Sequence, residues 1–438
     1  KIMENYMKFN FKKIFKSNFV KNVIFMMSGA AGAQAVAMLL APLITRLYGP
    51  EAFGVLGTFT AITRTIGPIV ALTYPIAIVL PRDKETATDL TKLSLVITFS
   101  IGFILGIVIL FFSDYIALIF NIEELKFLLY FVPIVVLFSG IMQVTEQWLI
   151  RIEEFKINAK THFYHSIIIN GSKAGLGLVY PVALVLISLE TISSGLRTIM
   201  MWSYLRKSGY KIKKQTKVNL KQIINVAKKY KDFPLFRAPE VFLSAFSQSL
   251  PVLLLTALFG PAATGFYNIG RTVLALPSML IGETIGSVFY PRITKAAHKG
   301  EDLYRLIKKA TFALAVIGVI PFGLIFLFGP TLFEFVFGEG WDRAGEYARW
   351  ISLASFSIFI NKPSVRAMPV LNAQKFHLIF TTTNLILRSI SLVIGFFVFD
   401  SDVVAVAMFG ITGFILNVIL ISITLNLSKE FYKNNKRR

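Results

Sequence analysis

Long apolar runs recur along the whole sequence, and no other feature restricts the fold as strongly. Runs of about 18 residues or more follow one another from one end of the chain to the other, and each is long enough to cross the roughly 30 Å hydrocarbon core of a bilayer. That core offers no water to backbone N–H and C=O groups, so the runs are expected to be α-helices. The sequence therefore predicts an all-α, polytopic membrane protein.

The composition supports this fold class. Apolar residues make up 55% and charged residues 16% of the 438 residues, whereas soluble domains have about 45–50% and about 25%. We expect about twelve transmembrane helices. The first should be retained rather than cleaved as a signal peptide, because apolar residues continue past Ala35-Val36-Ala37. The spans are placed near residues 22–47, 52–80, 92–112, 126–149, 161–180, 184–205, 235–258, 264–289, 308–328, 346–370, 376–399 and 403–427.

Lysine and arginine are distributed unevenly between the two sides of the predicted membrane. The chain has 46 of them and a formal net charge of +22. Of these, 35 lie in the termini and loops of one side, three (Arg46, Lys126 and Arg343) in the turns of the other, and eight within the spans. Because cytoplasmic loops are enriched in these residues, we expect both termini in the cytoplasm. Charge spread over every loop of one side argues against a nucleic-acid partner.

No sequence feature indicates an enzyme or a metal site. The chain has no cysteine, and its four histidines (His162, His165, His298 and His377) lack the spacing of metal ligands. It contains no phosphate-binding loop, zinc-protease motif or nucleophile elbow. We expect no catalytic residue, no metal and no cofactor. The sequence also has no ATPase domain, so any uphill transport would have to draw on a gradient, such as one of H⁺ or Na⁺.

Two segments outside the spans have an amphipathic pattern. Apolar residues share one face in 7–19, with lysines between them, and recur at helical spacing in 219–231. Each is either a helix lying on the anionic inner leaflet, in contact with membrane lipids, or an ordinary solvated connector.

An internal repeat divides the chain into halves. The pattern G-P-x-A-x-G occurs at 49–54 and again at 260–265, an offset of 211 residues, and Arg64-Thr65 and Pro81-Arg82 have counterparts in Arg271-Thr272 and Pro291-Arg292. Glycine permits the left-handed end of one helix, and proline suits the start of the next. Six spans in each half predict two parallel bundles, an N-lobe and a C-lobe, around a central cationic cavity. The expected parts are a basic amphipathic N-terminus (1–21), an N-terminal six-helix bundle (22–205), a basic cytoplasmic linker (206–234), a C-terminal six-helix bundle (235–427) and a basic cytoplasmic tail (428–438).

The predicted spans contain eight cations but few acids. A charge facing lipid at the bilayer centre costs about 2.5–3.5 kcal/mol on insertion scales, so the cations should line a hydrated cavity or pair with acids. A positive cavity selects an anion such as phosphate, for which arginine offers paired donors. For Arg349 and Arg366 we expect snorkelling or pairing. We assign substrate binding to Arg64, Arg271, Lys173, Arg197, Lys362 and Arg388.

Three stretches carry a family resemblance. They are LLAPLITRLYGPEAFGVLGTF (39–59), AIVLPRDKETATDL (77–90) and the segment 231–292, which includes NIGRTVLALP. They resemble the Wzx-type polysaccharide flippases of the MATE/MurJ-like (MOP) exporter superfamily, and the resemblance covers most of 22–427. It implies a twelve-helix, two-lobed flippase of the bacterial cytoplasmic membrane that works by alternating access.

The resemblance also implies a substrate and site residues. The substrate would be an undecaprenyl-diphosphate-linked oligosaccharide for O-antigen, capsule or a similar polymer, with a polysaccharide polymerase and a chain-length regulator as partners. Arg271 matches the family best, and Arg64 less closely. Relatives often have an acid just before the AIVLP stretch, where this chain has Pro75. Ion coupling would then fall to Glu146, Glu240 or Glu283.

Three other functions compete with this interpretation. A multidrug antiporter of the same fold carries mostly cations, which a positive cavity would repel. A lipid-linked peptidoglycan precursor flippase usually has two further helices. A membrane polymerase or acyltransferase needs a sizeable external loop, whereas the largest outer segments here run only from about 113 to 125 and from about 329 to 345.

Overall fold

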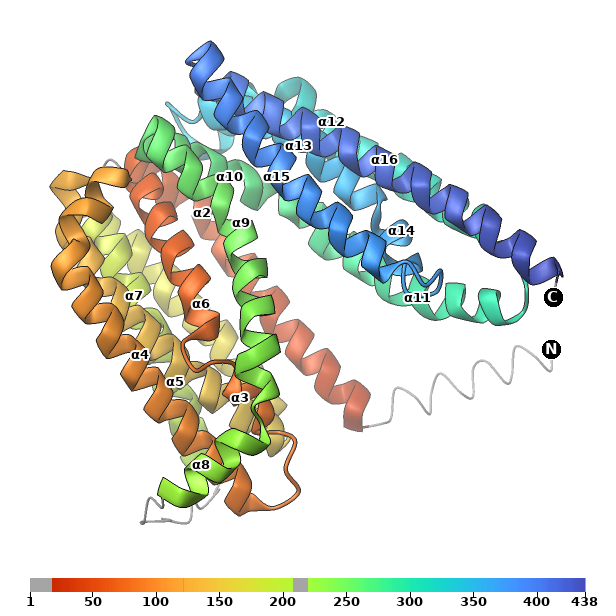
Figure 1. Ribbon diagram of the computed structural model, residues 1–438. Helices are drawn as coiled ribbons and strands as arrows, with labels where there is room; N and C mark the ends of the chain where they lie inside the picture. The colour runs from red at the N-terminus through yellow and green to blue at the C-terminus, as the bar shows by residue number, and fades with distance from the viewer. Residues whose placement is uncertain (1–17, 121, 208–219, 438) are drawn as a thin grey trace. The chain divides into compact units, whose positions relative to one another are not determined.

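The computed structural model describes residues 18–120, 122–207 and 220–437, and every regular element in these ranges is a helix (Figure 1). This confirms the all-α prediction. The amphipathic pattern at 7–19 and the basic N-terminus lie almost entirely outside the described residues, as do residues 208–219 of the predicted linker at 206–234.

The chain forms two compact units. The first contains residues 1–48 and 58–249, and the second contains 49–57 and 250–438. The predicted bundles therefore differ from these units in two segments: residues 235–249 belong to the first unit, and residues 49–57, which include the start of the second predicted span, belong to the second. The six-helix composition of each bundle stays a prediction.

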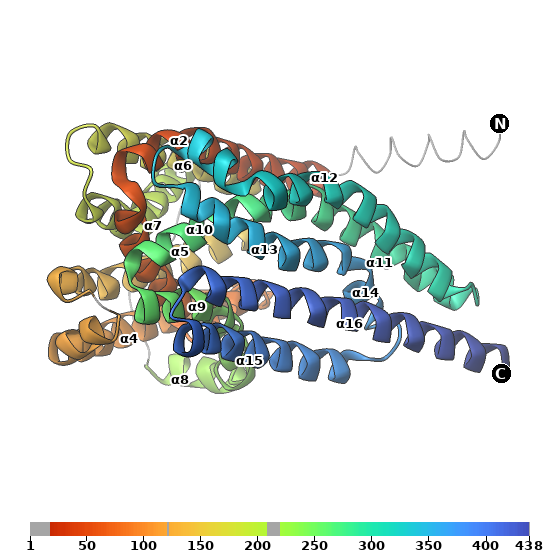
Figure 2. The same ribbon diagram turned by 90° about the horizontal axis from the view of Figure 1, so that it is seen from above.

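The first unit is built mainly from long helices that lie side by side (Figures 1 and 2). Its elements are α2 (Asn18–Ile66) apart from 49–57, η1 (Gly67–Ile69), α3 (Tyr74–Ala77), α4 (Lys84–Ile119), η2 (Glu123–Phe131), α5 (Val132–Arg151), α6 (Phe155–Gly177), α7 (Ala183–Lys207), α8 (Leu220–Lys229), η3 (Phe233–Arg237) and the first half of α9 (Ala238–Phe259).

In the second unit, α13 packs against α12, α10 and α16, and α15 packs against α16. Its elements are residues 49–57 of α2, the second half of α9, α10 (Pro261–Pro277), η4 (Ser278–Gly282), α11 (Glu283–His298), α12 (Leu303–Phe337), α13 (Asp342–Ile360), α14 (Lys362–Ala367), α15 (Gln374–Phe399) and α16 (Asp402–Arg437).

Eight segments of the described chain are long and apolar enough to cross a membrane. One of them, Ser28–Ile69, has 42 residues and contains a kink at Gly49, so it covers most of the first two predicted spans. The predicted spans 161–180, 264–289 and 346–370 do not coincide with a helix that is long and apolar enough to cross a membrane. The first falls on the polar helix α6, and the other two are interrupted, at η4 and at Asn361. The chain is a multi-pass membrane protein, and the count of twelve spans stays a prediction.

The two Gly-Pro turns have the same backbone conformation. Gly49 has φ 70° and ψ 174°, and Gly260 has φ 81° and ψ 179°. The positive φ was expected. However, ψ near 180° places both residues in a region that essentially only glycine reaches, rather than in the left-handed helical region. Each turn therefore requires glycine for the same reason.

Helix α8 is present, and residues of its apolar face pack against α3 and α4 of the same unit. Ile223 and Val226 are buried in a cluster with Tyr74, Ile78 and Leu90. The hydroxyl of Tyr74 also donates to the carbonyl of Ala227 at 3.1 Å. Part of the apolar face is therefore covered by protein, at Ile223 and Val226, while Ile224 is 51% exposed. Whether α8 also contacts the leaflet stays a prediction.

The second predicted span is broken after Gly67, and α5 stabilises the break. Leu72 and Thr73 have positive φ values of 48° and 58°. The amide of Gln143 donates to the carbonyl of Gly67 at 2.8 Å. The guanidinium of Arg151 donates to the carbonyls of Ile78, Pro81 and Asp83. These donors satisfy carbonyls that a continuous helix would have paired internally.

We predict that Arg151→Ala lowers the free energy of unfolding by about 2–3 kcal/mol, because hydrogen bonds from a charged donor contribute about 1.5–3 kcal/mol each and water replaces part of the loss. Thermal unfolding of the purified protein in detergent measures the effect. Arg206→Ala is the matched control, since Arg206 is exposed near the end of α7 and makes no polar contact with the described residues. Equal unfolding temperatures for the two variants would contradict the role assigned to Arg151.

Candidate functional site

Polar residues form a ladder between three helices of the first unit. Helices α5, α6 and α7 contact one another. On α6 the polar positions run from Asn158 to Lys173, a rise of about 22 Å at 1.5 Å per residue, which is most of the thickness of a bilayer core. The members of the ladder are Glu146 on α5, Asn158, His165, Ser166, Asn170 and Lys173 on α6, and Glu190, Ser193 and Arg197 on α7.

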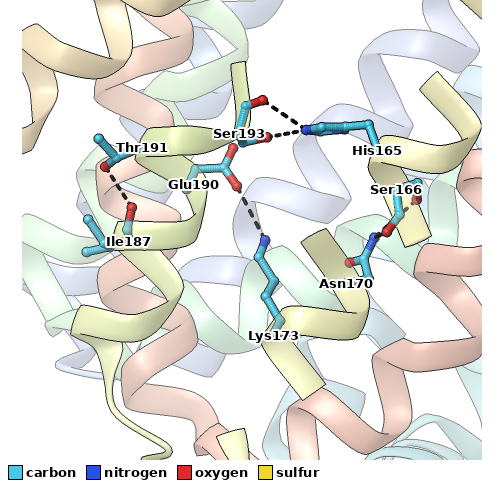
Figure 3. Close-up of polar contacts among 8 residues, drawn as sticks. All are labelled: His165, Ser166, Asn170, Lys173, Ile187, Glu190, Thr191 and Ser193. Carbon is cyan, nitrogen blue, oxygen red and sulfur yellow. Dashed lines mark hydrogen bonds and ion pairs between the residues drawn. The ribbon is translucent and has the colours of Figure 1, made fainter. Parts of the chain in front are cut away.

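One end of the ladder is an ion pair. The ammonium group of Lys173 lies 3.3 Å from a carboxylate oxygen of Glu190 (Figure 3). The two side chains are 13% and 27% exposed, so the pair is largely shielded from water. The hydroxyl of Tyr48 donates to the backbone carbonyl of Lys173 at 2.9 Å, which ties α2 to this end of α6.

Uncharged hydrogen bonds occupy the middle of the ladder (Figure 3). The Nε2 atom of His165 lies 3.0 Å from the carbonyl oxygen and 2.9 Å from the hydroxyl of Ser193. On the same helix, the hydroxyl of Ser166 donates to the carbonyl of Ala33 at 2.7 Å. The amide of Asn170 donates to the carbonyl of Ser166.

A second ion pair forms the other end. The guanidinium of Arg197 donates to the carboxylate of Glu146 at 2.6 Å and to the side-chain oxygen of Asn158 at 2.8 Å. These three residues come from three different helices, so the interaction ties α5, α6 and α7 together. The Nε atom of Arg197 is buried without a hydrogen-bond partner among the described residues.

The structure therefore pairs two of the cations assigned to substrate binding. Lys173 and Arg197 each have a carboxylate partner, and Glu146, assigned to ion coupling, is one of them. Glu240 pairs with Arg237 on an exposed turn of helix. The side chain of Glu283 lies outside the described residues. The roles of all these residues in transport stay predictions.

Sequence reasoning missed Asn158, His165 and Ser193 as members of this network. A signal was present, because Asn158, His162, His165 and Ser166, Asn170 and Lys173 recur every three or four residues along α6. The histidines were assessed only as metal ligands, and no group of three His, Cys, Asp or Glu side chains in the described chain is placed to hold a metal ion.

The second unit contains a different arrangement of cations. The guanidinium carbon of Arg388 lies 3.8 Å from the centre of the Phe409 ring, and its Nε is 3.4 Å from the carbonyl of Phe409. An arginine over an aromatic face is stabilised without an acid. Arg271 is close enough to repel Arg388 electrostatically. No carboxylate in the described part of the chain pairs with Arg388.

The remaining cations differ in their surroundings. Arg64 is exposed and makes no hydrogen bond or ion pair with the described residues. Lys362 is half-buried at the start of α14. Arg349 donates to the carbonyls of Phe326 and Leu327, and Arg366 is exposed. The correspondence between Arg64 and Arg271 stays a prediction.

These arrangements favour different chemistry in the two units. In the first unit the charges are balanced in pairs, with separate uncharged hydrogen bonds between the two pairs. In the second unit Arg388 has no carboxylate partner among the described residues and lies within electrostatic range of Arg271, so a bound anion would offset the positive charge there. The geometry therefore favours an anion near Arg388 and a structural role for the ladder.

Comparison with known proteins supports a transporter. A family model described as polysaccharide biosynthesis protein matches residues 43–346, and no curated protein matches the chain. An inward-facing multidrug resistance MATE family transporter of the MOP superfamily has a TM-score of 0.67 and 12% identity, over 93% of this chain and 99% of that chain. The lipid II flippase MurJ, in an inward closed conformation, has a TM-score of 0.68 and 16% identity, over 92% and 87%. A MOP superfamily transporter from Pyrococcus furiosus has a TM-score of 0.54 and 14% identity, over 95% and 96%. At these identities the likeness shows a shared fold.

We predict that Glu146→Ala lowers the free energy of unfolding by about 2–3 kcal/mol, because it leaves the charge of Arg197 largely uncompensated. Breaking a fully buried pair costs about 3–5 kcal/mol, and this pair is partly exposed. The double variant Glu146→Met/Arg197→Met should recover most of the loss. Glu240→Ala, which breaks an exposed pair, is the control and should change stability by less than about 1 kcal/mol. Equal losses for Glu146→Ala and Glu240→Ala would show that the internal pair is not stabilising.

Proposed function

This chain belongs to the polysaccharide biosynthesis protein family, and we propose that it is a flippase that carries a lipid-linked oligosaccharide from the inner to the outer leaflet of the bacterial cytoplasmic membrane. The proposed substrate is an undecaprenyl-diphosphate-linked repeat unit, which supplies a polymerase outside. The family and the shared transporter fold support the class of function.

The arrangement of Arg388, whose guanidinium lies over the Phe409 ring without a carboxylate partner among the described residues, carries the proposal of an anionic substrate, and Arg271 adds positive charge from α10. A diphosphate has several oxygens that accept paired hydrogen bonds from guanidinium groups. Arg388 is oriented by the Phe409 ring and carbonyl, so its remaining donors are available to a ligand. Arg64 and Lys362 would contribute further positive charge along the path. Cationic drugs, the usual cargo of a multidrug antiporter, would be repelled by the same groups.

Ion coupling is proposed at the Glu146–Arg197 pair. A carboxylate that releases its arginine when it takes up a proton changes the contacts among three helices at once. The role is assigned to Glu146 in preference to Glu240, because Glu240 is exposed and paired only with its neighbour on the same turn.

We predict that Arg271→Ala and Arg388→Ala each reduce polymer export at least about tenfold, the effect of losing one hydrogen bond to a charged group. In a deletion strain without another flippase, wild-type protein should restore surface polymer, and its absence should trap lipid-linked oligosaccharide inside. Export is measured per unit of inserted protein. Arg271→Lys should retain part of the activity, because it keeps the charge but loses the paired donors.

The control for these variants is Arg349→Ala. Arg349 is an arginine of the same unit whose guanidinium donates to the backbone carbonyls of Phe326 and Leu327, so export per inserted protein should change less than twofold, about 0.4 kcal/mol. Wild-type export by both Arg271→Ala and Arg388→Ala at normal abundance would remove these residues from the proposed site. Normal surface polymer in the deletion strain would count against the flippase itself.

A further prediction concerns orientation. With Lys and Arg concentrated on one side, α8 is expected in the cytoplasm and the Gly338–Gly340 turn outside. The chain has no native cysteine, so Lys221→Cys and Gly340→Cys are single-site reporters. An impermeant maleimide should label Gly340→Cys in intact cells, and Lys221→Cys only after the membrane is opened. The reverse pattern would invert the topology.

A further inference from the structure

The two Gly-Pro motifs contact each other inside the second unit, which includes residues 49–57. A Cβ atom on Gly54 would overlap the backbone carbonyl of Pro261, and a Cβ atom on Gly265 would overlap the carbonyl of Pro50. Backbone carbonyls cannot swing aside as a flexible side chain does. Both glycines are therefore needed for the close approach of α2 and α10.

The contact is reciprocal. Gly54 and Gly265 are the sixth residues of the two motifs, and Pro50 and Pro261 are the second, so the same pair of positions meets twice with the roles exchanged. Such an exchange is the mark of a local twofold axis. With the repeat offset of 211 residues, Gly57 corresponds to Asn268, and these two residues are also in contact.

Asn268 lies at this local axis, and its side-chain amide has a hydrogen-bond donor without a partner among the described residues. A Cβ atom on Gly57 would overlap the side-chain amide of Asn268 and would lie 2.8 Å from the methyl group of Thr264. The Nδ2 atom of Asn268 is buried and has no hydrogen-bond partner among the described residues. Buried donors are nearly always paired, and each exception calls for an explanation.

Side chains hold the segment 49–57 on the second unit as well. The ring of Phe53, on α2, packs edge-on against Trp341 with centroids 5.6 Å apart. The ring of Phe266, on α10, packs edge-on against the same indole with centroids 6.1 Å apart. Trp341 is only 1% exposed. The helix pair is thus closed by ring packing near the turns and by Gly57 and Asn268 further along.

The position of Asn268 points to a ligand. It lies three residues before Arg271 on α10, so the two side chains are neighbours on one helix surface. A donor that has no partner while the helix pair is closed gains one if the pair separates and admits a hydrogen-bond acceptor. Arg271 would bring such an acceptor, an anionic oxygen, to the same surface.

We propose that Gly57 and Asn268 form a separable lock, closed in this structure, and that the amide of Asn268 donates to the anionic head group beside Arg271 when the lock opens. The ligand named here rests on the proposed function, whereas the lock itself rests on the contacts of the second unit. Glycine at 57 allows closure, and asparagine at 268 supplies the donor on opening.

The test is a reversible cross-link between the two positions. The ideal Cβ of residue 57 lies 3.3 Å from the Cγ of Asn268, close to the separation of a Cβ and the distant sulfur in a disulfide. In this cysteine-free chain, Gly57→Cys/Asn268→Cys in a Thr264→Ser background, which removes both the amide and the methyl group that a Cβ at 57 would meet, should oxidise to an intramolecular disulfide, detected by a gel shift. Export should stop on oxidation and return after reduction. The Gly57→Cys and Asn268→Cys single variants, treated in the same way, control for damage by the oxidant.

A second variant separates the donor from the movement. Asn268→Leu removes the unsatisfied amide, so the melting temperature should rise, while export should fall at least about tenfold, as expected for a lost hydrogen bond to a charged group. Gly323→Ala is the control, since a Cβ there meets nothing within 4 Å. Full export by the oxidised double variant, or no disulfide at all, would overturn the lock. Failure of the flippase proposal would instead show as absent export in the wild type, and the gel shift and melting temperature would still decide the lock.

Discussion

A charge inside a bilayer has to find water, an opposite charge or an aromatic face, and this requirement organises both units. In the first unit, Lys173 and Arg197 meet carboxylates from neighbouring helices. In the second, Arg388 lies over the ring of Phe409. The first solution neutralises charge and fixes helices to one another. The second keeps the positive charge and fixes only its direction, which suits a group that has to bind and release an anion.

Backbone groups obey the same requirement. The break after Gly67 would leave carbonyls unpaired in a medium without water. Gln143 and Arg151 supply side-chain donors from α5, while the hydroxyls of Thr73 and Tyr74 donate to the carbonyls of Phe233 and Ala227. The irregular segment is thus held by protein on two sides. It also links the start of α9 to the first unit, which explains why residues 235–249 belong there.

The apolar runs and the Gly-Pro motifs were sufficient to predict the helical fold and the positive φ of Gly49 and Gly260, because both depend on local properties of the chain. The pairing of Arg197 with Glu146, 51 residues away, depends on how helices pack and on which rotamer each long side chain adopts. Hydropathy gives no information on helix packing or on side-chain rotamers. The same holds for α8, where periodicity indicated an apolar face but not the surface of α3 and α4 against which Ile223 and Val226 pack. The spacing of polar residues along α6 was readable, yet it did not reveal their partners on α7.

The internal repeat also explains why α2 and α10 meet at equivalent positions that carry different residues. Duplication gives the two turns the same dihedral angles and brings equivalent positions together on a local axis. Two asparagines at 57 and 268 would collide there, and two glycines would leave no donor. The halves therefore have to differ at the axis for the helices to close and still present a polar group. The same reasoning applies to the charges, since Lys173 and Arg197 are neutralised in one unit while Arg388 is left without an acid in the described part of the other. Similar backbones with different side chains allow one unit to maintain the helix packing and leave the other with the unneutralised arginine that the proposed substrate site requires.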